Sequence, residues 1–390
     1  MKPIIFLGGL FVISLLSACS STIKNDALVG WKTIKSPDKI NIGDPATLTR
    51  ALQSSINYLQ TRPKEATINT ADRTLSSSQL VDGLEKVLLL VKNYNDPESF
   101  NQSLQENFCF YQPESKQALF TGYYRSRISG SKNKTKTYRY PIYGEPQDLL
   151  TLNTSEFPIL ANIPGIPKQI RGKLAPNNQI KPYLSRAEID LGNLKNKNSK
   201  ILAWVKDPIE LFFMHIQGSG IISFQDGSSL ELGYANSNGW PYRSIGTYLA
   251  QQKKLVLSEI SKQSIEAYLR DHPEEIAAIL NFNPSYVFFQ PQQGGSFGNL
   301  NQVLTPFRSV ATDQSIFPAA ALLWIEISSS PTYEGLSQLV LNQDVGGAIK
   351  GSTRLDLFCG EGQNAEYIAG HLKNPGKVIL ILPRSIDGGC

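Results

Sequence analysis

The chain has 390 residues, of which 41% are hydrophobic and 18% charged, and its formal net charge is +5 at pH 7. This length is ample for a large core and exceeds the usual size of one domain, so two domains are expected. Two basic clusters, residues 131–139 and 195–200, lack regularly spaced aromatic residues. Nucleic-acid binding needs a stronger basic face, so we interpret both clusters as solvated loops and expect no nucleic-acid partner.

The first residues have the features of a secretion signal. Lys2 gives the positive end, residues 4–16 form an apolar run, and small residues follow it. The run is too short for a typical membrane-spanning helix. It ends in Leu-Ser-Ala-Cys at residues 16–19, which is similar to a bacterial lipobox. Cys19 is therefore the candidate lipidation site, where buried acyl methylenes contribute about 0.8 kcal/mol each to membrane anchoring.

The residue after Cys19 bears on localisation. Ser20 stands where many lipoproteins retained at the inner membrane carry an aspartate. We therefore predict an outer-membrane lipoprotein that faces the periplasm, with residues 1–18 as signal peptide and 19–43 as a polar tether. Lys2 is the only charged residue among residues 1–18, so their removal lowers the net charge from +5 to +4. An ordinary signal peptide with a chance cysteine is the alternative.

The segment after the tether is predicted to be helical. Asp44 and Pro45 have the residue types of a helix cap and a first helical position. Leucine and isoleucine then recur on one helical face up to Leu59. Ser78 is predicted to cap a second helix, which ends at Asn-Asp-Pro, residues 95–97.

From residue 118 onward the pattern is that of strands. Up to about residue 250 the chain is rich in Gly, Pro, Tyr, Thr and Ser with short apolar runs, one of which covers residues 211–224. A helical pair is predicted at 257–270 and 273–280, and further strands follow it. Many short strands with close turn signals favour a β-barrel or sandwich.

Cysteines and histidines are sparse. Cys109, Cys359 and Cys390 remain once Cys19 is set aside, so at most one internal disulfide can form, and its pairing is left open. The chain has no C-x-x-C spacing, and its three histidines are scattered, so a zinc site is not expected.

Two aspartates, Asp344 and Asp356, flank a glycine-containing run near the C-terminus. The lysine of this run precedes the last glycine, which does not fit a Walker loop, and a calcium loop would need alternating acidic ligands. In a strand through residues 354–358, Asp356 and Phe358 share one face. Burial there would raise the pKa of Asp356, as a general acid requires. Asp313 is a third candidate carboxylate. The alternative to a catalytic role is that all three aspartates are turn or capping residues.

Two other motifs suggest chemistry. Residues 294–298 fit the G-x-S-x-G pattern around Ser296, with His371 downstream, but no helix pattern follows, so we predict a glycine loop. Residues 214–220 contain His215, expected on a strand as a core or rim group, and Gln217, suited to hydrogen-bonding a polar ligand. The 16 tyrosines suit sugar stacking and a core equally well.

Seven motifs in a fixed order carry a resemblance that extends over about residues 105–383. The chain resembles the membrane-bound lytic transglycosylase A (MltA) family at residues 120–126, 183–190, 214–220, 242–246, 283–290, 309–318 and 344–358. The lipobox fits as well, because members are murein-degrading outer-membrane lipoproteins.

The resemblance implies a mainly β fold with N-terminal helices and two domains. A double-psi β-barrel, here residues 44–126 and 281–390, would contain the three-aspartate (3D) region. A smaller β-barrel, residues 127–280, would be inserted into it, and a glycan strand would lie in the groove between them. The segment after Pro383 has no counterpart in this resemblance.

The resemblance also implies the site. Asp356 matches the catalytic acid, and Asp344 and Asp313 match two companions that orient or tune it. Thr121, Tyr123 and Tyr124 match the strand that borders the groove. Gln217 and Ser219 match the substrate-binding side of the insert, and Cys359 has no part in the mechanism.

A single acid suits the chemistry that the family performs. A hydrolase needs two carboxylates. In a lytic transglycosylase the C6 hydroxyl of N-acetylmuramic acid attacks its own C1, so that Asp356 would protonate the β-1,4 oxygen of the bond to N-acetylglucosamine and then accept the hydroxyl proton. The 1,6-anhydro product forms without a metal or organic cofactor.

The expected partners are peptidoglycan glycan strands and the outer membrane through the lipid anchor, with murein synthases or scaffold proteins as further candidates. Two alternative functions remain: a non-catalytic murein-binding lipoprotein and a hydrolase that uses Ser296.

Overall fold

The computed structural model describes residues 30–37, 40–71, 73–115, 117–160, 163, 166–167, 169–194, 199–385 and 387–390. The predicted signal peptide and Cys19 lie outside these residues. Within them, no helix combines the length and the apolar character needed to cross a membrane.

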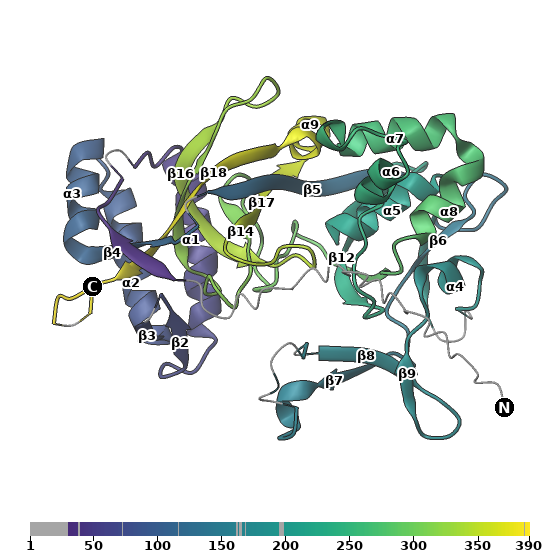
Figure 1. Cartoon of the computed structure of the whole chain (residues 1–390), viewed down its shortest axis with the longest axis horizontal. Coiled ribbons are helices and arrows are strands. Elements are labelled where there is room, and N and C mark those ends of the chain that lie inside the picture. The colour runs from purple at the N-terminus through teal and green to yellow at the C-terminus, as the bar shows by residue number, and fades with distance from the viewer. Residues whose placement is uncertain are drawn as a thin grey trace, which may run out of the picture.

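The described residues form many strands and shorter helices, which confirms a mainly β fold with N-terminal helices (Figure 1). The helices are α1 (Pro45–Gln60), α2 (Ser77–Lys92), α3 (Pro97–Asn107), α4 (Arg186–Asp190), α5 (Pro208–Gln217), α6 (Ile245–Gln251), α7 (Lys262–Asp271), α8 (Ile276–Asn281) and α9 (Gln363–His371), with 3-10 turns η1 (Thr154–Glu156), η2 (Leu257–Glu259) and η3 (Pro273–Glu275).

The strands follow the same chain order. They are β1 (Trp31–Ile34), β2 (Thr67–Thr70), β3 (Arg73–Ser76), β4 (Phe108–Pro113), β5 (Ala118–Ser131), β6 (Tyr140–Tyr143), β7 (Leu150–Asn153), β8 (Gln169–Leu174), β9 (Ile180–Pro182), β10 (Ile201–Val205), β11 (Gly220–Phe224), β12 (Ser229–Ser237), β13 (Val287–Pro291), β14 (Ser309–Ala311), β15 (Leu322–Ile327), β16 (Leu336–Asp344), β17 (Arg354–Glu361) and β18 (Lys373–Pro383).

The N-terminal helices begin at capping residues. The Asp44 side chain accepts a hydrogen bond from the Ala46 N–H and Pro45 opens α1, as predicted. Helix α2 starts two residues earlier than predicted, because Ser76 rather than Ser78 caps it in a capping box with Gln79. The Asn-Asp-Pro run that was predicted to end α2 instead starts α3, an element the sequence analysis missed.

The described part of the predicted tether is part of the fold, which corrects the sequence analysis. Strand β1 pairs antiparallel with β4. Ile40 and Ile42 are each 1% exposed in the main core. Burying two isoleucine side chains contributes about 3 to 6 kcal/mol, so a short, mostly polar segment can still be held in place.

Six strands close into a ring among the described residues. They pair in the order β18, β15, β16, β14, β17 and β5, and β5 returns to pair with β18. The pairs β14–β16 and β17–β5 are parallel, and the other four pairs are antiparallel. Helices α1 and α2 pack against this ring through β16 and β18, and their apolar faces complete the largest core.

A second group of paired strands uses the other end of β5. In pairing order it contains β6, β10, β5, β11, β12 and β13. A single bridge between Gly144 and Phe289 joins its two ends. Helices α5 to α8 pack beside this group around a separate apolar cluster.

Strand β5 therefore belongs to both lobes, and in Figure 1 it runs from the first lobe into the second. A second connection lies beside it, where Lys262 of α7 forms an ion pair with Glu366 of α9. The predicted boundary at residue 126 falls inside β5, so one continuous strand fixes the position of one lobe relative to the other.

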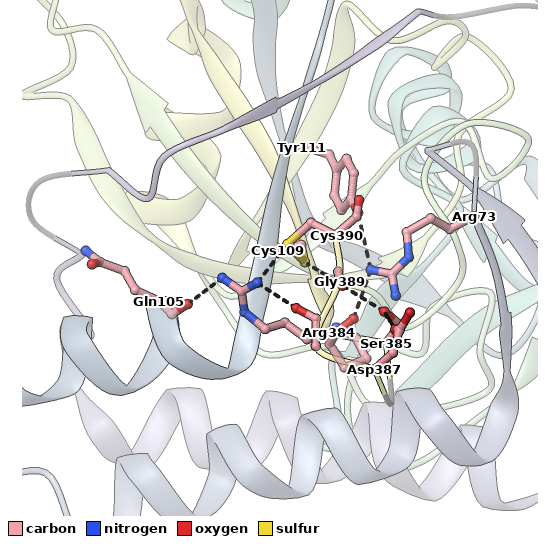
Figure 2. Close-up of a disulfide and its surroundings, with 11 residues drawn as sticks. Arg73, Gln105, Cys109, Tyr111, Arg384, Ser385, Asp387, Gly389 and Cys390 are labelled. Carbon is pink, nitrogen blue, oxygen red and sulfur yellow. Dashed lines mark hydrogen bonds between the residues drawn. A yellow bond between two sulfur atoms is a disulfide. The ribbon is translucent and has the colours of Figure 1, made fainter.

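The segment after β18 folds back onto β4 (Figure 2). Cys390 forms a disulfide with Cys109, which resolves the pairing that sequence left open, and Cys359 is a buried free thiol. The Arg384 guanidinium donates to the carbonyl of Gln105 at 3.1 Å. The Tyr111 hydroxyl donates to the carbonyl of Cys390 at 3.0 Å, so the segment is held by covalent and polar contacts.

Candidate active site

One row of laterally paired residues organises the candidate site. Ala311 of β14 pairs with Asp344 of β16 on one side and with Asp356 of β17 on the other. Asp356 in turn pairs with Thr121 of β5. Residues that pair laterally point to the same face of a sheet, and two strand spacings separate the aspartate Cα atoms by about 10 Å. The ring thus brings two aspartates and a threonine together from segments more than 200 residues apart in sequence.

Asp356 lies on β17 as predicted. Its neighbours Leu355 and Leu357 are fully buried on the opposite face. The Thr121 hydroxyl donates to Asp356 Oδ1 at 2.6 Å. Burial raises the pKa of Asp356, and this effect outweighs the hydrogen bond from Thr121 and the charge of Arg354, which both lower it.

Asp344 is the second carboxyl group of the row. Its Oδ2 accepts a hydrogen bond from the Tyr123 hydroxyl at 2.8 Å. Its Oδ1 accepts from the backbone N–H groups of Asn299 and Val345, both at 2.9 Å. Burial raises the pKa of Asp344 to about 6 even so. The carboxyl is fixed by three donors, and it in turn fixes the phenol of Tyr123.

Asp313 has a different environment from the other two. Its Oδ1 accepts from the backbone and hydroxyl of Ser315, and its Oδ2 accepts from the Gly351 N–H at 3.0 Å. Burial raises the pKa of Asp313, but these hydrogen bonds outweigh it, so the pKa lies below the usual value. Asp313 therefore ties the turn before β17 to the end of β14.

A groove of about 510 Å³ lies against the Thr121–Asp356 end of this row, and Asp344 and Asp313 do not line it. The ring contributes Thr121, Tyr123 and Asp356 to its wall. The second lobe contributes Gln217 and Tyr242, so both lobes form the groove. Asp356 is the one acidic residue among the described groove-lining residues.

On the groove wall formed by the second lobe, the structure differs from one expectation of the sequence analysis. His215 and Gln217 lie in helix α5, not on a strand, because Asp207 and Pro208 start a helix and Gly218 ends it in the left-handed conformation, at φ 75°. Gln217 lines the groove, and its Oε1 accepts the Tyr124 N–H at 2.9 Å. This hydrogen bond links the two lobes beside Asp356.

His215 is a buried, hydrogen-bonded group, as expected. Its Nδ1 lies 3.1 Å from Nη1 of Arg186. Because a guanidinium can only donate, Nδ1 is the acceptor and the neutral ring carries its proton on Nε2. Burial, with the Arg186 charge, holds the pKa of His215 well below its usual value. His215 therefore stays neutral and is unsuited to act as an acid.

Two predicted binding residues lie outside the groove wall. The Tyr124 side chain packs with Cys359 and Ala365, and its hydroxyl donates to Glu366. Ser219 lies between α5 and β11 and does not line the groove among the described residues.

Sequence reasoning missed Arg354 and Tyr242, which both line the groove. A signal for Arg354 was present, because it lies two residues before Asp356 on one strand and so shares its face.

The chain matches two known domains. Residues 119–290 match the MltA specific insert domain, and residues 308–382 match the 3D domain. These matches define a class of protein in which the insert precedes a 3D region within one chain, and both lobes described above contain strands of the matched segments.

Curated relatives agree with this class. The chain is 35% identical over 270 residues to membrane-bound lytic murein transglycosylase A of Escherichia coli strain K12, and this covers 67% of the chain and 65% of that protein. It is 31% identical over 268 residues to the Vibrio cholerae protein of the same name, covering 67% and 64%. The matched region thus spans just under two thirds of the length of these relatives. The chain belongs to the MltA family.

Solved structures have the same fold over most of the chain. A membrane-bound lytic murein transglycosylase from Agrobacterium tumefaciens superposes with a TM-score of 0.77 at 26% identity, covering 91% of this chain and 98% of that one. The E. coli MltA structure with bound chitohexaose has a TM-score of 0.68 at 27% identity, covering 91% and 94%.

Proposed function

We propose that this chain is a peptidoglycan lytic transglycosylase. It would cleave the β-1,4 bond between N-acetylmuramic acid and N-acetylglucosamine and leave 1,6-anhydromuramic acid ends. The observation that supports this most is Asp356, whose raised pKa and place in the groove wall suit a general acid. The names of the curated relatives, and the chitohexaose bound by one of them, support the same substrate class.

The hydrogen bond of Asp356 supports one of its two oxygens as the proton carrier. Oδ1 accepts the Thr121 hydroxyl, so Oδ2 is the oxygen free to carry and donate a proton. Asp356 donates this proton to the glycosidic oxygen as the bond to C1 breaks. The C6 hydroxyl of the same muramoyl residue then forms a bond to C1, and its proton passes to the Asp356 carboxylate. The ring closure is intramolecular, so proximity lowers its barrier.

Asp344 and Tyr123 hold the groove wall next to this acid. The Tyr123 ring packs at a tilt against Phe358, with 5.2 Å between ring centroids, while its hydroxyl is fixed by Asp344. We assign both to positioning. Asp313 fixes the turn that leads into β17.

The remaining features of the proposal concern architecture and location. We propose that the six-stranded ring is a double-psi β-barrel, with domain limits near residues 44–126, 127–280 and 281–390. We also propose that Cys19 is lipidated, that the protein faces the periplasm from the outer membrane, and that murein synthases or scaffold proteins bind it there.

One experiment separates the candidate functions. Purified sacculi are digested with the protein and with its Asp356→Asn and Ser296→Ala variants, and the soluble products are analysed by mass spectrometry. We expect 1,6-anhydro products from the wild type and from Ser296→Ala, and none from Asp356→Asn. Circular dichroism and thermal unfolding show that each variant is folded.

Other outcomes have defined meanings. Products with reducing ends would identify a lysozyme-like hydrolase. Binding to sacculi without release of products would identify a non-catalytic murein-binding protein. Loss of activity in Ser296→Ala alone would point to a serine hydrolase.

The structure disfavours that last function. Ser296 is 5% exposed and lies in a glycine loop as predicted. Turns rather than a helix follow it, so a nucleophile elbow is absent from this described segment.

A further inference from the structure

The groove carries more positive than negative charge. Its described lining contains one acidic residue, Asp356, and four cationic ones: Arg186, Lys262, Arg354 and Lys373. A glycan backbone of N-acetylglucosamine alone is neutral, so it does not call for four cations around one acid.

Three of these cations already have acceptors in the protein. Arg186 donates to the carbonyls of Asn283 and Ser285. Lys262 forms ion pairs with Glu266 and Glu366. Lys373 Nζ lies 3.5 Å from the carbonyl of Leu257.

Arg354 differs from them. Among the described residues its guanidinium has neither a hydrogen bond nor an ion pair, although it is close enough to Asp356 and Tyr242 to influence both electrostatically. A groove-lining guanidinium with all its donors unused is suited to a bidentate bond with a carboxylate of a ligand.

The position of Arg354 relative to Asp356 follows from the strand. The two residues are i and i+2 on β17, with fully buried Leu355 pointing to the other face. Their Cα atoms are therefore about 7 Å apart on the same side of the strand. An anion bound to Arg354 would therefore lie near the sugar whose glycosidic oxygen Asp356 would protonate, at the distance of a substituent on that sugar.

We propose that Arg354 forms a carboxylate subsite that recognises the O3 substituent of the muramoyl residue at the cleavage position, an inference that rests on the proposed function. The carboxylate is the free lactyl acid in a strand without peptides, or an acid of the stem peptide in a substituted strand. N-acetylglucosamine has no such substituent. The subsite therefore selects which of the two alternating β-1,4 linkages faces Asp356.

Charge on the substrate is the variable that tests this. Three sets of glycan strands are prepared: strands with stem peptides, strands freed of peptides by an amidase, and peptide-free strands whose lactyl carboxylates are converted to methylamides. All three keep the C6 hydroxyl that the reaction needs. The kcat/KM of wild type, Arg354→Gln and Arg354→Lys is measured on each at constant ionic strength.

We expect Arg354→Gln to lower kcat/KM about ten- to hundredfold on an anionic substrate, as for loss of a charge-assisted hydrogen bond. On the methylamide strands it should stay within about twofold of wild type, and Arg354→Lys should keep part of the preference. Whether the loss is seen with substituted strands, peptide-free strands or both identifies the carboxylate. Lys86→Gln, which removes the same charge from the exposed face of α2, should change none of these values.

Two results would overturn the subsite. One is an equal loss on neutral and anionic strands accompanied by a shifted pH profile, which would mean that Arg354 acts only on the pKa of Asp356. The other is no loss on any substrate. If the wild type cleaves nothing, the proposed function fails, but the subsite is still tested by the affinity of Asp356→Asn, with and without Arg354→Gln, for peptide-free and methylamide strands.

Discussion

Breaking the Cys109–Cys390 disulfide should destabilise the fold without affecting the groove. The two cysteines are 281 residues apart, for which the chain-entropy relation gives about 5 to 6 kcal/mol of stabilisation. Measured disulfide contributions are usually about 2 to 4 kcal/mol. The polar contacts of Arg384 and Tyr111 also remain when the bond is absent. We therefore expect Cys390→Ala to lose about 3 kcal/mol of unfolding free energy.

Calorimetry and urea unfolding measure this loss. For a chain of this size, ~3 kcal/mol corresponds to a fall in Tm of about 4 °C. A reductant should lower the Tm of the wild type by the same amount and leave Cys390→Ala unchanged. Activity at 25 °C should stay within about twofold of wild type. The disulfide joins β4 to the C-terminal segment, which in Figure 1 lie at the end of the first lobe away from the second lobe, and neither segment lines the groove among the described residues. This reasoning fails if Tm is unchanged, or if the reduced wild type and the variant differ by several degrees.

Three further substitutions test the site and its supports. Asp344→Asn removes a carboxyl whose pKa is raised from 3.8 to about 6 in the folded protein. Because the fold favours the protonated form of this carboxyl, the stability of the wild type should fall relative to that of the variant as pH rises from 3.8 through 6. Urea unfolding over a pH series measures this difference, and a constant difference would contradict the prediction. Thr121→Val removes the hydrogen bond that holds Oδ1 of Asp356, so kcat should fall about tenfold. Because this donor lowers the pKa of Asp356, its loss should also move the alkaline limb of the pH–rate profile to higher pH, and an unmoved limb would contradict this. Leu355→Ala leaves a cavity at a fully buried position and should cost about 2 to 5 kcal/mol in urea unfolding, and a loss below about 1 kcal/mol would show that the site collapses around it.

Local patterns predicted several elements correctly. The alternation in residues 354–358 predicted the strand and the shared face of Asp356 and Phe358, because side chains on a strand alternate whatever its neighbours are. Asp44 and Pro45 predicted the start of α1 for a similar reason, since capping involves only nearby atoms.

The errors arose where short-range patterns were ambiguous. Residues 211–217 are almost continuously apolar, which fits a buried strand and a buried helix equally well. The start signal at Asp207–Pro208 and the stop signal at Gly218 would have decided for a helix. Ile40 and Ile42 were assigned to a tether, because two apolar residues in a polar segment give no sign of the core that receives them.

Long-range features were out of reach of the residues alone. Nothing local indicates that Cys109 pairs with Cys390 rather than Cys359, or that Ala311 pairs with both Asp344 and Asp356. The resemblance to a family supplied the candidate aspartates, and the ring of strands shows how two of them, Asp344 and Asp356, come to share one face.

The pairing of β5 with β18 has a consequence for the order in which the protein can fold. The first strand of the closed ring to be synthesised is completed at residue 131, and its last partner only at residue 383. During synthesis from the N-terminus, the apolar residues of β4 and β5 therefore lack β18 as a pairing partner until more than 240 further residues have been made. Over this period they are exposed to aggregation. The strands of the second lobe are complete at β13, long before that point. Synthesis from the N-terminus thus favours folding of the second lobe before the first. Ring closure, and formation of the Cys109–Cys390 disulfide by an external oxidant, come as the last steps.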